Sequence, residues 1–324
     1  MLGAIIGDII GSRWEFHPTN DYNFELFSDK NSFTDDTICT IAVADAILHN
    51  SNDYGKYIHE WCRRYPNPMG GYGGSFAQWV RSDNPKPYGS YGNGSAMRVS
   101  PVAWAFHNKE LMLYAAQHTA ECTHNHPEGV KGAQTVALAI CRALQLRKLH
   151  LKAHDVVRTV ITECVDFSGY SIDIHKKDVE NKFDETCQGT VPVALWIINQ
   201  SKGFEDAIRK AVSLGADADT LGAIVGGIAE AIWGIPMKLR HQVEKFLPDD
   251  MQTVLHKFRL ARPYSYKPLI DTCFSGDDFS DVSWDMLYDI DGKDAHNEIM
   301  SKTKSENARK RLLMAERAKA RENW

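Results

Sequence analysis

The sequence has little of several features that mark common classes of protein. Its 324 residues carry a formal net charge of −5, so there is no basic excess of the kind that general nucleic-acid binding requires. Its seven cysteines are scattered and form no CxxC pair, which argues against a disulfide framework and against a structural zinc site. We therefore expect a protein of the reducing cytoplasm.

Targeting segments and membrane-length apolar runs are also lacking. The opening MLGAIIGDIIG is apolar, but it has no basic leader and is interrupted by Asp8. The run LGAIVGGIAEAIWGIP at 221–236 is shorter than a membrane span and contains Glu230. We expect no association with a membrane.

Strict apolar–polar alternation is scarce, whereas apolar residues recur at helical spacing through much of the chain. This pattern predicts an all-α domain over residues 1–262. The predicted helices cover 38–48, 130–147, 152–163, 190–200, 204–214, 218–233, 238–247 and 251–261. Glycines recur every four residues at Gly3, Gly7 and Gly11, and again near Gly222 and Gly226. Because glycine weakens a helix, such repeats indicate helices whose backbones approach closely.

Residues 263–324 differ in character from the predicted domain. Residues 263–295 show no clear periodicity, and residues 301–324 contain eight Lys or Arg and three Glu. We interpret this C-terminal extension as an irregular segment followed by a basic, solvated helix that packs on its own domain or on a neighbouring subunit. A nucleic-acid-binding arm is the alternative.

The stretch FTDDT places Asp35 and Asp36 side by side after Thr34, just before a predicted helix. Taken alone, it is best explained as a helix start, because threonine caps helices and acidic residues favour the positive end of the helix dipole.

A second stretch, ADADT, changes this interpretation. It places Asp217, Asp219 and Thr220 directly before a glycine-rich apolar helix, again without a nearby cation. If the two helix starts meet, four carboxylates share one small volume, where like charges raise each other's pKa strongly unless a cation lies between them. Carboxylate and hydroxyl oxygens suit Mg²⁺ or Mn²⁺, and this number of ligands favours two ions.

Two further acids lie in GDIIGSRWEF, residues 7–16. Asp8 sits among apolar residues, so we expect it to be hydrogen-bonded and to hold a nearby loop. Glu15 lies between Trp14 and Phe16, a setting that fits either a surface glutamate or a pocket acid with a perturbed pKa.

Three stretches rich in loop-forming residues are predicted to be long surface loops, at 65–75, 84–95 and 167–189. Within the second, YGNGS offers a flexible turn whose backbone N–H groups could bind a phosphate, although a simple tight turn explains it equally well. In CTHNHPEG, we favour His124 over His126 as a substrate-contacting residue, because it directly follows a predicted helix end.

Taken together, these motifs resemble the ADP-ribosylglycohydrolase family over about residues 1–262. Six segments occur in the order found in that family: GAIIGDIIGSRWEF, FTDDT, GNGSAMRVSPVAW, THNHPEGVKGA, ETCQGTVPVALW and SLGADADTLGAIVGGIAEAIWGIP. The resemblance implies a compact orthogonal helical fold with a binuclear Mg²⁺ centre, with Mn²⁺ as an alternative metal. The metal ligands that it implies are Thr34, Asp35, Asp36, Asp217, Asp219 and Thr220.

The resemblance also implies residues that contact the substrate, namely Asn93, Gly94, Ser95, Met97, His124 and Gln188. The expected activity is Mg²⁺-dependent hydrolysis of the bond between ADP-ribose and a modified acceptor, which is a protein side chain, a small molecule or a nucleobase. The carboxylate that accepts the proton of the attacking water would be Asp35, Asp219 or Glu15. The alternative function is a non-catalytic ADP-ribose-binding module.

Overall fold

The computed structural model describes residues 1–261, which form helices joined by loops and contain no β-strand. The prediction of an all-α fold is confirmed. The extension predicted for 263–324 lies outside the described residues. The helices are α1 (Leu2–Gly11), η1 (Ser12–Trp14), α2 (Asp35–Leu48), α3 (Tyr54–Arg64), α4 (Gly74–Arg81), α5 (Gly94–Met97), α6 (Ser100–Ala105), α7 (Lys109–Glu121), α8 (Pro127–Arg147), α9 (Ala153–Ser168), α10 (Lys176–Val179), α11 (Cys187–Gln200), α12 (Phe204–Val212), α13 (Ala218–Trp233), α14 (Met237–Val243), η2 (Glu244–Phe246) and α15 (Asp249–Ala261).

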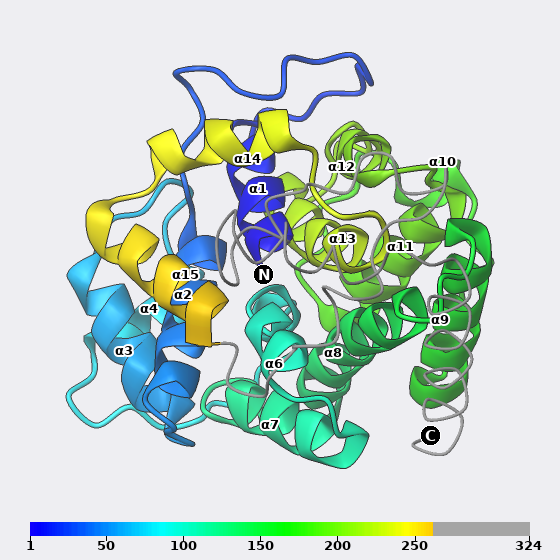
Figure 1. Cartoon of the computed structure of the whole chain (residues 1–324). Helices are drawn as coiled ribbons and strands as arrows, with labels where there is room; N and C mark the ends of the chain where they lie inside the picture. The colour runs from blue at the N-terminus through cyan, green and yellow to red at the C-terminus, as the bar shows by residue number, and fades with distance from the viewer. Residues whose placement is uncertain (262–324) are drawn as a thin grey trace, which may run out of the picture.

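Two buried helices, α1 and α13, form the centre of the fold. Every residue of both helices is buried. Figure 1 shows them near the middle of the view, with α2, α3 and α4 on the left and α8, α9 and α11 on the right. Because neither helix presents a face to solvent, both carry apolar residues on every side, and the few polar side chains, Asp8 in α1 and Asp219, Thr220 and Glu230 in α13, are buried with them.

The glycine repeats are the contact between α1 and α13, as the spacing predicts. A Cβ atom on Gly3 would collide with the backbone of Gly226, and one on Gly7 would collide with the backbone of Gly222. At the far end of α1, Gly11 lies against the backbone of Ala218. The two helices therefore pack backbone against backbone along their length.

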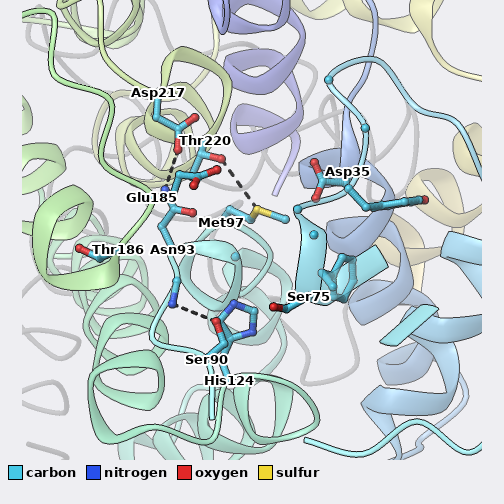
Figure 2. Close-up of a pocket in the computed structure, with 18 of the residues that line it drawn as sticks. Asp35, Ser75, Ser90, Asn93, Met97, His124, Glu185, Thr186, Asp217 and Thr220 are labelled. Carbon is cyan, nitrogen blue, oxygen red and sulfur yellow. Dashed lines mark hydrogen bonds between the residues drawn. The ribbon is translucent and has the colours of Figure 1, made fainter. Parts of the chain in front are cut away.

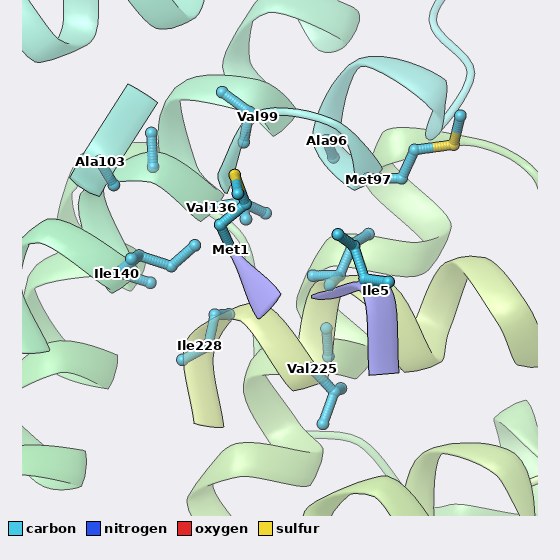
Figure 3. Close-up of a cluster of buried hydrophobic side chains, with 14 of the residues drawn as sticks. Met1, Ile5, Ala96, Met97, Val99, Ala103, Val136, Ile140, Val225 and Ile228 are labelled. Carbon is cyan, nitrogen blue, oxygen red and sulfur yellow. The ribbon is translucent and has the colours of Figure 1, made fainter. Parts of the chain in front are cut away.

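The surrounding helices close the core over this pair. Figure 3 shows Ile5 of α1, Val225 and Ile228 of α13, and Val136 and Ile140 of α8 in one buried apolar cluster. Burial of large aliphatic side chains of this kind is the main source of stability in a helical fold. Within residues 1–261, none of the helices combines the length and the apolar character that a membrane span needs.

Most predicted helices are present, with shifted ends. The segment predicted at 218–233 is α13 with the same bounds, and 251–261 lies within α15. The helix predicted from 190 begins earlier, at Cys187, because the Thr186 side chain accepts a hydrogen bond from the N–H of Gly189 and caps it. The helix predicted at 238–247 is divided between α14 and η2.

Candidate active site

The structure brings together the two helix starts that carry the paired aspartates. Thr34 caps α2, because its side-chain oxygen accepts a hydrogen bond from the N–H of Asp36 at 3.2 Å. Asp217 is the residue that precedes α13. Thr220, in the first turn of α13, donates to Oδ2 of Asp36 at 3.1 Å. The two motifs, far apart in the sequence, thus form one cluster.

Asp8 of α1 holds the start of α2 through hydrogen bonds, as expected of a buried structural acid. It is fully buried in α1 and accepts hydrogen bonds from the N–H groups of Thr34 and Thr37, each at 3.1 Å. The hydroxyl groups of the same two threonines also donate to its carboxylate. Burial and the Asp219 carboxylate raise the pKa of Asp8 to about 7, although these hydrogen bonds favour its charged form.

The cluster has an excess of negative charge. Burial, followed by repulsion from neighbouring carboxylates, raises the pKa of Asp35, Asp36 and Asp217 well above the usual range. Burial also raises the pKa of Asp219. Within residues 1–261, no Lys, Arg or amino-terminal group forms an ion pair with any of these acids. Among the described residues, no ion pair therefore offsets this charge.

Two oxygens in the cluster also lack a hydrogen-bond partner. Oδ1 of Asp36 and Oδ1 of Asp219 are buried and accept no hydrogen bond from the described part of the chain. In the same part of the chain, no three His, Cys, Asp or Glu side chains are already arranged to hold a metal ion. Carboxylates that repel one another do not close on a shared point without a cation. The unpartnered oxygens and the all-oxygen donor set fit Mg²⁺ or Mn²⁺.

A cleft of about 720 Å³ lies over the cluster, a volume typical of a small-molecule site. Asp35, Asp217, Asp219 and Thr220 all line it. Figure 2 shows Asp217 and Thr220 on one side of the cleft and Asp35 on the other. Thr34 and Asp36 lie beneath this surface and are fully buried.

The three long loops form much of the wall of this cleft. The first contributes Gly70 to Gly73, the second contributes Tyr88 to Asn93, and the third contributes Glu185 and Thr186. An isolated antiparallel bridge between Gly92 and Thr186 joins the second and third loops. The loops thus converge on one site although their sequences are distant.

Glu15 lines the same cleft and is half-buried just after η1. Burial, and then repulsion from Asp219 and Asp35, raise its pKa to about 9. Its Oε2 atom is buried without a partner in the described structure. It lies so close to Gly70 that a Cβ atom there would overlap it, and Gly70 also has a φ of +78°. Of the two alternatives for Glu15, the structure supports the pocket acid.

The predicted contact residues in the YGNGS turn and just after it divide into two groups. Asn93, Gly94 and Met97 line the cleft, and Nδ2 of Asn93 donates to Oδ2 of Asp217 at 2.7 Å. Ser95 does not line the cleft. It is fully buried, and its hydroxyl donates to the backbone oxygen of Gly129 at 2.6 Å.

The remaining predicted contact residues, His124 and Gln188, line different hollows. His124 is buried and lines the cleft, whereas His126 caps α8. Gln188 is exposed and lines a neighbouring hollow of about 310 Å³, which shares Asp217 with the main cleft. Glu185 and Arg98 also line the cleft but were not predicted, although each lies inside or next to a motif that the sequence singles out.

Comparisons with known proteins identify the family of this chain. The sequence profile described as ADP-ribosylglycohydrolase matches residues 1–267. The chain is 26% identical over 272 residues to ADP-ribosylarginine hydrolase Tri1 of Pseudomonas putida (strain GB-1), a match that covers 76% of this chain and 72% of that protein. It is 26% identical over 306 residues to ADP-ribosylhydrolase ARH3 of Homo sapiens, covering 72% of this chain and 84% of that protein.

A solved structure shows the same fold. A chain of an ADP-ribosylglycohydrolase-related protein complex superposes with a TM-score of 0.57 and 24% sequence identity, covering 80% of this chain and 95% of that chain. The profile match spans most of the chain, including both aspartate motifs and the loops of the cleft. The chain therefore belongs to the ADP-ribosylglycohydrolase family, whose members hydrolyse glycosidic bonds of ADP-ribose.

Proposed function

We propose that this protein is a Mg²⁺-dependent hydrolase that releases ADP-ribose from a modified acceptor and so reverses ADP-ribosylation. The observation that carries this proposal is the pair of buried oxygens, Asp36 Oδ1 and Asp219 Oδ1, which have no hydrogen-bond partner within residues 1–261 and lie in a carboxylate cluster without an ion pair there. The similarity to ADP-ribosylarginine hydrolase Tri1 and ADP-ribosylhydrolase ARH3 supports the substrate class.

The residues that would hold two metal ions come from both helix starts: Thr34, Asp35, Asp36, Asp217, Asp219 and Thr220. When bound, the metal supplies positive charge that offsets these carboxylates and favours deprotonation of a water molecule. Mn²⁺ would serve in place of Mg²⁺, because both prefer oxygen ligands.

The reaction then needs a base and a bond that breaks at the ribose. Asp35, Asp219 or Glu15 would take one proton from water as its oxygen bonds to C1 of the ribose. The bond from C1 to the acceptor breaks with oxocarbenium character, and the departing acceptor takes up one proton, which balances the proton that the carboxylate removed from water. The products are free ADP-ribose and the unmodified acceptor. Asp35 is only half-buried at the cleft surface, so it is well placed to reach water.

A panel of substrates tests the proposal. Arginine-linked, serine-linked, ester-linked, O-acyl and nucleobase-linked ADP-ribose are incubated with Mg²⁺, with Mn²⁺ and with EDTA, and released ADP-ribose is measured by chromatography. We expect release from at least one linkage and none in EDTA. Equal release in EDTA would refute the dependence on metal.

Variants separate the cluster from a general effect of charge. Asp35→Asn and Asp219→Asn should each abolish release while the helical circular dichroism is retained. Asp249→Asn is the matched control, because Asp249 is an exposed acid in the first turn of α15, next to Asp250, and lies outside the cleft. It should leave activity unchanged. Tight ADP-ribose binding by calorimetry without release of ADP-ribose from any substrate would support the binding-module alternative instead.

We also propose a cytoplasmic location. All six cysteines in the described part of the chain are free thiols, which fits a reducing compartment. Cell fractionation of the tagged full chain checks this expectation.

A further inference from the structure

Arg98 is a buried cation beside the cleft. Its side chain is 1% exposed, and within residues 1–261 it forms no ion pair with a carboxylate. Its Nη2 atom instead donates to the backbone oxygen of Thr119 at 2.8 Å and to Oγ1 of Thr123 at 2.7 Å. A guanidinium group has only donors, so Oγ1 of Thr123 must accept here.

The proton of the Thr123 hydroxyl therefore points elsewhere. Thr123 is fully buried, and its Oγ1 lies 2.6 Å from Nδ1 of His124. If Nδ1 carried a proton, this hydroxyl would receive two donors, and its own proton would be left with the Cys122 thiol, a weak acceptor. Leaving a buried donor without a good acceptor is unfavourable. The arrangement is satisfied when Thr123 donates to Nδ1.

This hydrogen bond determines which nitrogen of the His124 ring carries the proton. A neutral imidazole carries one N–H, so a bare Nδ1 leaves the proton on Nε2. His124 lines the cleft, and Cβ atoms built on Gly94 and Gly92 would lie 3.1 Å and 3.4 Å from Nε2. Glycine at these two positions keeps side-chain atoms away from Nε2.

We propose that Arg98 and Thr123 are positioning residues, which hold His124 as a neutral ring whose Nε2–H donates a hydrogen bond to an oxygen of the bound ADP-ribosyl group. The identity of this ligand rests on the proposed function. The assignment of the proton rests only on the hydrogen bonds within the protein.

The surroundings of His124 favour the neutral ring. Burial and the Arg98 guanidinium hold the pKa of His124 well below its usual range. Two other titratable residues of the described structure lie near it: Cys122, two positions earlier, and Tyr88, whose ring centroid is 6.1 Å from that of His124. None of these groups is a carboxylate that would stabilise the imidazolium.

Nuclear magnetic resonance of the full chain, with ¹⁵N-labelled histidine, tests the assignment without any substrate. We expect His124 to show a protonated Nε2 and a bare Nδ1 at every pH from about 5 to 8, the range in which an ordinary histidine titrates. A protonated Nδ1, or an imidazolium that forms near pH 6.5, would overturn the proposal.

Thr123 variants test the positioning role. Thr123→Val should let the ring sample both tautomers and weaken ADP-ribose binding in calorimetry by about 10-fold, the effect of losing one hydrogen bond to a charged group. Thr123→Ser keeps the hydroxyl group, so it should show the wild-type spectrum and affinity. Thr135→Val is the matched control, because Thr135 is equally buried but its hydroxyl bonds within its own helix, to Lys131.

The outcomes separate this inference from the proposed function. An unchanged tautomer of His124 in Thr123→Val refutes the positioning role of Thr123 even if the enzyme is fully active. If the wild-type protein shows the expected tautomer but does not bind ADP-ribose, the positioning of His124 is supported and its proposed ligand is refuted. If Thr123→Val does not fold, the wild-type spectrum and Thr123→Ser still decide the result.

Discussion

Thr220 donates a hydrogen bond to Asp36 across 184 positions of sequence. This bond joins the first turns of α2 and α13, and it leaves the other oxygen of Asp36 without a partner. One side chain therefore both connects the two halves of the cluster and orients a carboxylate within it.

Thr220→Val should weaken Mg²⁺ binding while the fold is retained. The substitution removes the donor that orients Asp36, and loss of such a partner costs about 10-fold or more in metal affinity. The concentration of Mg²⁺ that gives half-maximal release of ADP-ribose is the measurement. An unchanged Mg²⁺ requirement would show that Thr220 has no role in the metal centre.

Raising the pH should destabilise the metal-free protein. Glu15 has its pKa raised from 4.5 to about 9 in the folded state, so its contribution to stability is full below pH 4.5 and is lost as pH rises towards 9. The aspartates of the cluster shift in the same direction. Because Mg²⁺ binds the ionised acids, the gain in Tm over EDTA should grow from about pH 5 to about pH 8.5. A gain that shrinks with pH would contradict this cluster.

Glu15→Gln should raise the stability of the metal-free protein at pH 8 by about 1 kcal/mol, because the amide keeps the shape without the charge. If Glu15 is the base, kcat should fall while KM changes little. Glu60→Gln is the control, since Glu60 is exposed and lies outside the cleft. Thermal unfolding in EDTA and steady-state kinetics in Mg²⁺ measure the two effects. Equal changes in both variants would show that Glu15 has no special role.

Gly7→Ala should destabilise the fold by about 2 kcal/mol or more, although alanine is the better helix former. The new Cβ atom would overlap the backbone of Gly222, and overpacking of a core commonly costs about 1–3 kcal/mol. Gly203→Ala is the control, because a Cβ atom there has no neighbour within 4 Å and its φ of 177° is extended. Urea unfolding compares them. If Gly7→Ala lowered the free energy of unfolding by less than Gly203→Ala does, α1 and α13 would have to separate easily.

The basic residues beyond the described structure allow one more prediction. If 301–324 form a nucleic-acid arm, deletion of 296–324 should abolish binding of the protein to polynucleotide at moderate salt and leave release of ADP-ribose from a peptide unchanged. Filter binding across a salt series measures this. Equal binding by the shortened chain would remove the nucleic-acid alternative.

Sequence patterns predicted those parts of the fold that depend on local spacing. Helix α13 has its predicted bounds, because Asp217 precedes a segment with apolar residues in every turn and Gly234, with a φ of 77°, ends it. Helix α3 was not predicted, although Tyr54, Ile58 and Trp61 follow helical spacing, because charged and aromatic residues interrupt the pattern.

The site was harder to predict where it depends on distances across the fold. The aspartate motifs indicated a shared cluster only on the condition that the two helices meet, and no local pattern gives that distance. Ser95 lies inside the predicted contact turn, yet the first turn of α5 directs its hydroxyl to Gly129. Glu185 opens the ETCQG motif, but nothing local shows that it faces the cleft, and the bridge between Gly92 and Thr186 brings its loop there.

The backbone contact between α1 and α13 also limits how the site can vary. Gly3, Gly7 and Gly11 leave no side-chain torsions between the helices, so their separation is set by the sizes of backbone atoms. Asp8, which holds the start of α2, is carried by α1, and Asp219 is carried by α13. The distance between the two acidic turns is thus fixed by the backbone contact between α1 and α13. Substitutions elsewhere in the core can change its stability without changing this span.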